Sequence, residues 1–191
     1  MCIRDRYRVR VLCRTPGAFV VSHPDLKILA GSLTDPQAVE RSLTGSHAVA
    51  MVFGPRPPYQ EIFCADATAT ILNAMRQCGV RRVVCVTGAM IGEGVRRSWA
   101  FERLARYFRR RAPALAADRA EQERLVKTSG LDWTLVKPPR LTESGGTGRY
   151  SAGCQVRVGL LSRINREDLA RFILDELNST ENLGQAVVIR H

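Results

Sequence analysis

The sequence of 191 residues lacks the features that would place it outside the ordinary single-domain proteins. It has no apolar run near the roughly 18–20 residues that a membrane-spanning helix needs. Its basic opening residues are not followed by the apolar segment of a signal peptide. None of its six cysteines forms a C-x-x-C pair, so their spacing supports neither a metal site nor a disulfide framework. We therefore expect one cytoplasmic domain without a metal or a membrane partner.

Lysine is also scarce, because 26 arginines and only three lysines contribute to the net charge of +11. Seven of the arginines fall between Arg96 and Arg111. This run would fit a nucleic-acid footprint, but it is more typical of a solvated helix face that also suits counter-ions and an anionic substrate. We expect the aromatic residues in the run to be core anchors rather than a base-stacking platform: Trp99, Phe101, Tyr107 and Phe108. The pattern therefore argues against nucleic acid as the partner.

Strand and helix signals alternate along the chain. Apolar or β-branched runs predict strands at residues 7–13, 26–31, 48–54, 81–90, 132–141 and 186–190. Helical spacing of apolar residues predicts helices at 35–45, 61–79, 118–130 and 165–177. Asp35 and Asn165 are suited to cap two of these helices. Strands separated by helices of this length indicate βαβ units, and so an α/β fold with a mostly parallel sheet.

Ligands of open α/β sheets bind beyond the carboxyl ends of the strands. The residues that follow the predicted strands are small or cyclic and are interspersed with arginine: Arg14-Thr15-Pro16, Gly31-Ser32-Leu33, Gly54-Pro55-Arg56, Thr87-Gly88-Ala89 and Pro138-Pro139-Arg140-Leu141. Such a set suits a flat, phosphorylated ligand that lies across the strand tips.

Four stretches in order carry a family resemblance: VRVLCRTP, LAGSLTDPQAVERSLTGSHAVAMVFG, ILNAMRQCGVRRVVCVTGAM and ERLVKTSGLDWTLVKPPRLTESGGTGRY. Together they resemble the atypical short-chain dehydrogenases that bind NAD(P)H, among them biliverdin-reductase-B-like, flavin-reductase-like and NmrA-like proteins. The resemblance implies a Rossmann-like, doubly wound, mostly parallel sheet. It also implies one NAD(P)-binding domain over residues 7–191 and NADP(H) as the cofactor.

The resemblance places the adenosine end of the cofactor at the first two strand tips. Arg14 matches the arginine that pairs with the 2′-phosphate of NADP, which would favour NADPH over NADH because a guanidinium fork suits a phosphate dianion. Thr15 would add a hydroxyl bond, and the alternative for Arg14 is a solvated strand end. Ser32 and Leu33 match the positions that touch the adenine, although the family usually has Asp where this chain has Ser32.

The other strand tips match the nicotinamide end. Gly54 and Pro55 match the turn beside the cofactor ribose. Thr87 and Gly88 match a pair next to the nicotinamide, where Thr87 is the candidate catalytic residue or simply a β-branched strand end. The loop that covers the nicotinamide in the family matches Pro138, Pro139, Arg140 and Leu141.

Two features of the family are missing. None of the four tyrosines has a lysine four residues on, so the usual proton donor is absent. The first strand, the turn G-x-x-G-x-x-G and the first helix, which together hold the pyrophosphate, are also missing. Residues 1–6 (MCIRDR) resemble a non-native leader, so we expect a truncated gene product that binds NADPH weakly, is poorly stable and is inactive as given. Without the central strand, the strands ending at Arg14 and at Phe53 would lack a shared neighbour.

The favoured function is NADPH-dependent reduction of a flat aromatic acceptor, such as a flavin, a biliverdin-like tetrapyrrole or a quinone. Positioning the hydride donor does most of the work in such reactions. The absent tyrosine–lysine pair favours the alternative, a non-catalytic NADP-binding redox sensor of the NmrA-like kind. The oligomeric state is left open.

Overall fold

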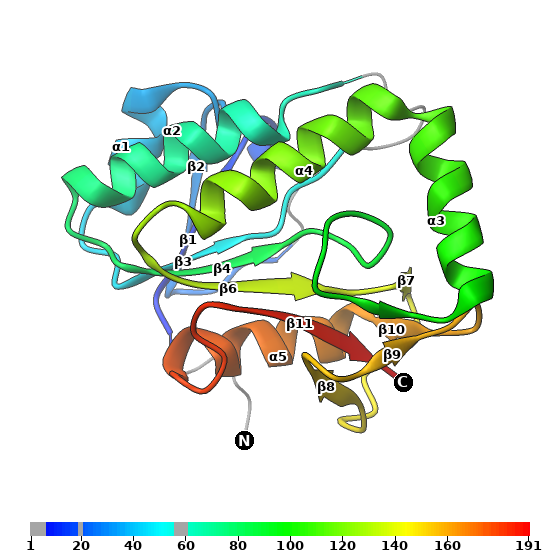
Figure 1. Cartoon of the computed structure of the whole chain (residues 1–191). Helices are drawn as coiled ribbons and strands as arrows, with labels where there is room; N and C mark the ends of the chain where they lie inside the picture. Colours follow the sequence, from blue (N-terminus) through cyan, green and yellow to red (C-terminus); the bar gives the residue numbers. More distant parts are fainter. Residues whose placement is uncertain (1–6, 19–20, 56–60) are drawn as a thin grey trace.

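A five-stranded sheet forms the centre of the protein in the computed structural model, which describes residues 7–18, 21–55 and 61–191 (Figure 1). Its strands stand in the order β3 (Ala48–Met51), β4 (Arg82–Val86), β6 (Asp132–Lys137), β11 (Gln185–Arg190) and β8 (Ser151–Gly153). All neighbours run parallel except β8, which is antiparallel to β11. The predicted α/β fold with a mostly parallel sheet is therefore confirmed.

Helices cover both faces of this sheet (Figure 1). One face carries α1 (Pro36–Leu43), α2 (Cys64–Gln77) and α4 (Pro113–Lys127), and the other carries α5 (Arg166–Asn178). Alternate residues of β4 enter the two cores, since Val83 and Cys85 join the cluster of α1, α2 and α4, whereas Val84 joins the cluster of α5. This is the doubly wound arrangement that the resemblance implies.

A second, two-stranded parallel sheet holds β1 (Val9–Cys13) and β2 (Leu26–Ala30), with the short 3-10 helix Pro16–Ala18 between them. Leu12 of β1 packs against the core cluster that contains Met51 of β3. Within the described residues, however, no hydrogen-bonded strand joins β1 to β3. Val52, just beyond β3, is 65% exposed, although strands of a parallel sheet are normally covered.

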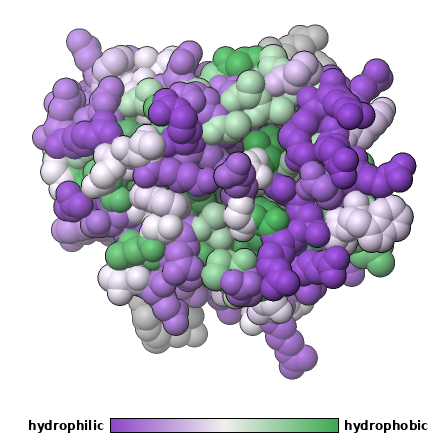
Figure 2. Space-filling model, viewed as in Figure 1, coloured by the Kyte–Doolittle hydropathy of each residue, from purple (hydrophilic) through white to green (hydrophobic). Residues whose placement is uncertain are grey.

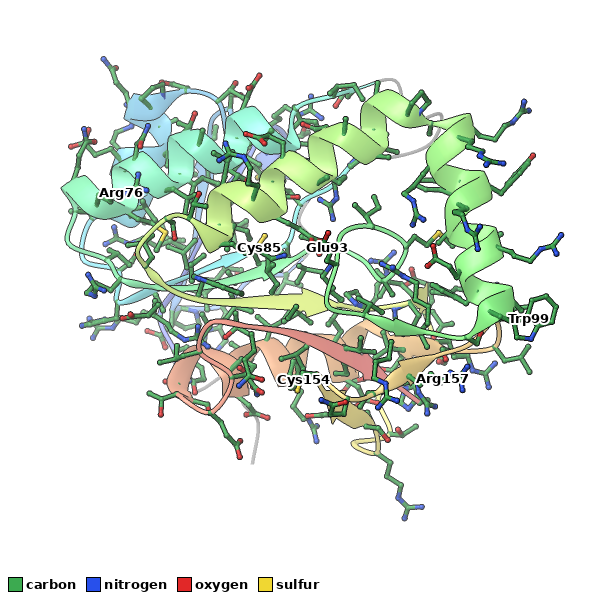
Figure 3. The ribbon with its side chains drawn as sticks, in the orientation of Figure 1. Arg76, Cys85, Glu93, Trp99, Cys154 and Arg157 are labelled. Atoms are coloured by element: carbon green, nitrogen blue, oxygen red, sulfur yellow. The ribbon has the colours of Figure 1, made fainter. Side chains whose placement is uncertain are left out.

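The chain between β4 and α4 departs from the sequence prediction. It forms the two-residue strand β5 (Arg96–Arg97), paired with β9 (Arg157–Val158), and the helix α3 (Trp99–Arg111). Phe101 and Ala105 are the buried residues of α3. Trp99 is 74% exposed and points away from the molecule in Figure 3.

The prediction of core anchors is accordingly wrong for Trp99 and for Tyr107, which is 61% exposed. The reason is that α3 packs along a single face and leaves the rest of its surface to solvent. Hydrophilic side chains gather on the side of the molecule where α3 lies (Figure 2). No helix in the described part of the chain is long and apolar enough to cross a membrane.

Candidate functional site

The predicted site residues lie at the carboxyl ends of the strands, but on two separate sheets. Arg14 follows β1 and is exposed, and its guanidinium meets the Glu61 carboxylate with Nη2 3.0 Å from Oε2. Hydrogen bonding to Glu61 raises the pKa of Arg14. Because an exposed ion pair contributes little stability, a phosphate can replace Glu61 as the partner of Arg14. Thr15 beside it is exposed as well.

Ser32 and Leu33 lie next to Arg14, because the amide of Gly31 bonds the carbonyl of Cys13 at 3.1 Å. The Ser32 hydroxyl lies 2.8 Å from the Thr34 hydroxyl and accepts from the Thr34 amide at 3.2 Å. Leu33 packs against the main core cluster. Ser32 is therefore engaged in the turn that leads into α1, which leaves its predicted adenine contact without direct support.

Arg119 of α4 joins the tips of β3 and β4. Its buried guanidinium donates to the Phe53 carbonyl at 3.3 Å and to the Thr87 carbonyl. A side chain at Gly54 would meet Arg119 at 3.6 Å, whereas one at Gly88 would meet no atom within 4 Å. Open space therefore lies beside Gly88, whereas Gly54 borders the Arg119 guanidinium. Pro55 continues this tip, and Arg56 lies outside the described residues.

The tip of β6 is bound to the tip of β4. The Thr87 amide donates to the Val136 carbonyl and the Ala89 amide donates to the Pro138 carbonyl, both at 3.0 Å. Pro138 is buried, Pro139 is half-buried, and the chain then enters the short strand β7 (Arg140–Thr142). The structure thus brings Gly54, Thr87 and Pro138 into one row, as the sequence predicts.

A buried ion pair lies beneath Thr87. The Lys137 ammonium has no exposed surface and donates to both Glu123 oxygens at 2.7 and 2.8 Å and to the Ile91 carbonyl at 2.9 Å. The Thr87 hydroxyl donates to Glu123 Oε1 at 2.8 Å. Burial lowers the pKa of Lys137, while Glu123 opposes this shift. Since its proton is directed at Glu123, Thr87 presents a lone pair rather than a proton to a ligand.

Glu123 also fixes the loop that follows β4. Gly92 has a φ of +67°, and a side chain there would come within 1.9 Å of Glu123 Oε2. Only glycine can therefore bring this loop over the carboxylate. Lys137, Glu123 and Thr87 form one network that sets the geometry of the candidate nicotinamide end.

Sequence reasoning missed Arg119, Glu123 and Lys137. One signal was available, because residues four apart on a helix share a face, and Arg119 and Glu123 both lie on the side of α4 that meets the strand tips. Lys137 was hidden as the last residue of an apolar strand. Tyr107, whose ring lies 6.0 Å from the Arg111 guanidinium, faces solvent on α3 and takes no part.

Arg14 is exposed at one set of strand tips, where it pairs with Glu61, and open space lies beside Gly88 at the other. The described residues contain no glycine-rich turn for a pyrophosphate between these two places. They also contain no group of three or more histidine, cysteine, aspartate or glutamate residues that could hold a metal ion.

The chain is similar in sequence to a known protein. A curated relative, (4-alkanoyl-5-oxo-2,5-dihydrofuran-3-yl)methyl phosphate reductase of Streptomyces griseus subsp. griseus, is 26% identical over 195 residues. The match covers 98% of this chain and 61% of that protein, so the chain spans less than two thirds of its relative.

Two solved structures share the fold. A short-chain dehydrogenase/reductase of Veillonella parvula in complex with NADP has a TM-score of 0.74 at 17% identity, covering 96% of this chain and 82% of its own. An anaerobilin reductase of Escherichia coli has a TM-score of 0.73 at 15% identity, covering 97% and 85%. A family model described as NAD(P)H-binding matches residues 2–180. The chain therefore belongs to the NAD(P)H-binding family, and it shares the fold of these two structures.

Proposed function

We propose that the protein is an NADPH-dependent reductase that transfers a hydride to a flat, conjugated acceptor such as a flavin, a linear tetrapyrrole or a quinone. The observation that carries this proposal is the row of strand tips, where Thr87 is fixed by Glu123 beside the open space at Gly88. The names of two relatives support it, since both are reductases and one acts on a phosphate ester.

In this proposal, the residues at the strand tips bind different parts of the cofactor. Arg14 binds the 2′-phosphate, with Thr15 beside it, and Ser32 and Leu33 border the adenine. Thr87 accepts a hydrogen bond from the nicotinamide amide or its ribose, because its own proton is held by Glu123. The hydride is supplied by the bound cofactor. The segment Pro138–Leu141 covers the nicotinamide and keeps water from it.

The test is NADPH oxidation by the chain extended at its N-terminus with the family's first strand, glycine-rich turn and first helix, with FMN, riboflavin, biliverdin and a quinone as separate acceptors. We expect turnover with at least one of them, and a Thr87→Val variant should lose roughly tenfold or more in kcat/KM, because a hydrogen bond of one to two kcal/mol is removed. Thr87→Ser keeps the hydroxyl and is the matched control. No turnover with any acceptor contradicts the proposal, as does a Thr87→Val variant that matches the parent.

A second candidate is a non-catalytic NADP sensor. It is favoured by Lys137, which is sealed beneath Thr87 with its three protons engaged and so reaches no acceptor as a proton donor. Cofactor binding without turnover, together with binding of a partner protein only in the presence of NADP(H), would support this function instead.

A further inference from the structure

Two arginines lie side by side on a small sheet next to the candidate nicotinamide end. Strand β7 pairs in parallel with β10 (Arg163–Asn165), and Arg140 stands directly opposite Arg163. In-register partners point to the same face of a sheet. Thr142 and Asn165 occupy the next position on that face, whereas Leu141 and Ile164 turn toward the core of α5.

Neither arginine is neutralised by the protein. Both are exposed, and within the described part of the chain neither guanidinium makes a hydrogen bond or an ion pair. Like charges directly opposite each other destabilise a pair of strands. By contrast, the nearby Arg166 binds Glu143 at 2.7 Å. Arg140 and Arg163 thus form a concentrated positive charge that lacks an anion.

The same face opens into a pocket of about 360 Å³, which Arg163 lines and Arg140 does not. Its lining consists of hydroxyl, amide, imidazole and guanidinium groups: Thr142, Ser144, Thr147, Arg163, Asn165 and His191. The Thr142 and Ser144 hydroxyls lie 3.2 Å apart. The His191 ring is held between the Arg149 carbonyl, 2.7 Å from Nδ1, and the Asn165 amide nitrogen, 3.0 Å from Nε2. Asn165, Thr147 and His191 are bonded within the protein. Arg163 and the hydroxyl pair of Thr142 and Ser144 can donate to an anion.

The carboxylates near this region are already engaged: Glu143 binds Arg166 at 2.7 Å, and Glu167 accepts from the Gly146 amide at 2.8 Å. Asp168 is fully buried and accepts from the Thr147 and Gly148 amides at 2.9 and 2.8 Å and from the Asn165 amide at 2.8 Å. Burial opposes ionisation of Asp168, but these hydrogen bonds outweigh it and hold its pKa at about 2. The hydrogen bonds from the amides of residues 147 and 148 stabilise the charge of Asp168 and fix this loop at the pocket. Asp168 therefore does not neutralise the two arginines.

We propose that the face formed by Arg140 and Arg163, with its pocket, is an anion site that binds a phosphate or carboxylate group of the acceptor. Arg140 follows the tip of β6 by three residues, and that tip is bound to the loop after Thr87. An acceptor whose conjugated system lies at Thr87 can therefore place an acidic group here. The identity of the ligand as an acceptor rests on the proposed function, whereas the anion site does not.

The test is a titration of the isotope-labelled protein with inorganic phosphate and, in a separate arm, with succinate, followed by NMR at constant ionic strength. We expect saturable shifts of the backbone amides at residues 140–147 and 163–168, with about millimolar dissociation constants. The arm with the tighter binding identifies the acid as phosphate or carboxylate. The double variant Arg140→Gln/Arg163→Gln should weaken binding about tenfold or more.

The matched control is the other pair of facing arginines, Arg96 and Arg157, on β5 and β9. Arg96 is bonded to Gln155 at 3.1 Å, and neither arginine lines the pocket (Arg157 is labelled in Figure 3). Arg96→Gln/Arg157→Gln should leave the titration unchanged. Shifts that do not saturate, or that are equal in both double variants, would overturn the proposal.

These titrations need neither NADPH nor turnover. Saturable phosphate binding in a protein that reduces no acceptor would contradict the proposed function but support the anion site. Reduction of an acceptor by a protein that shows no saturable anion binding would support the proposed function but contradict the anion site.

Discussion

The buried ion pair of Lys137 and Glu123 makes the stability of the protein depend on both residues together. A lysine without exposed surface is stable only while Glu123 neutralises it, and Glu123 in turn depends on Lys137. Breaking a buried ion pair from one side leaves an uncompensated charge, which is far costlier than replacing both partners. The network is therefore a constraint on mutation as well as a support for Thr87.

We predict that Lys137→Met lowers the free energy of unfolding by about 3–5 kcal/mol, because Glu123 is left buried and unpaired. The double variant Lys137→Met/Glu123→Gln should recover most of this loss, since no unpaired charge remains. Urea denaturation measures both. A Lys137→Met variant as stable as the parent would show that Glu123 finds another partner or takes up a proton.

Single residues at the site were only partly predictable from the sequence. Arg14, Gly54, Thr87 and Pro138 were found because each directly follows a strand signal. Arg119 and Glu123 come from a helix, and only the folded chain shows that α4 aims them at the strand tips. Local patterns report which residues end an element, whereas contacts between elements depend on the packing.

At the scale of elements, the sequence predicted the helix caps made by the residue that precedes the helix. It did not predict a cap supplied by a residue of another helix. Asp35 caps α1 through the Gln37 amide at 3.0 Å, and Asn165 caps α5 through the Asp168 amide at 2.7 Å, as expected. Helix α2 begins at Cys64, three residues later than predicted, and has no cap of its own. The strands β5, β7, β9 and β10 have two or three residues each, too few to show a period of two.

The cap of α2 comes from α4. Asp118 accepts from the Cys64 and Ala65 amides at 3.0 and 2.9 Å, which also places a carboxylate at the positive end of the helix dipole. We predict that Asp118→Ala lowers the free energy of unfolding by about 1–2 kcal/mol. Asp35→Ala, which removes a local and exposed cap, is the matched control with a smaller effect. Equal losses from the two variants in chemical denaturation would contradict the special role of Asp118.

At the scale of the whole molecule, the residues of the proposed cofactor site are divided between separate sheets. Arg14, Thr15, Ser32 and Leu33 belong to the sheet of β1 and β2, and the nicotinamide end belongs to the five-stranded sheet. Their relative position depends on side-chain packing such as that of Leu12, without hydrogen bonds between β1 and β3 in the described residues. The resemblance predicted this division, but hydrophobic periodicity alone gave no sign of it.

We predict that this chain binds NADPH with a dissociation constant weaker than micromolar, because the two half-sites are not held in register and no described turn contacts the pyrophosphate. We also predict that it unfolds at a low temperature. Isothermal titration and differential scanning calorimetry measure the two quantities. Micromolar binding, or a sharp cooperative transition well above ordinary temperature, would show that side-chain packing suffices.

The division of the sheet also sets how the amide protons of the chain exchange with solvent. Strands β4 and β6 are bonded on both sides, so their amides exchange only when the whole domain opens. Strands β1 and β2 are bonded only to each other in the described residues, so residues 9–13 and 26–30 can open as a unit at lower cost. A dinucleotide that spans both sheets would slow exchange most at β1 and β2, and cofactor binding would thereby act as the last step of folding.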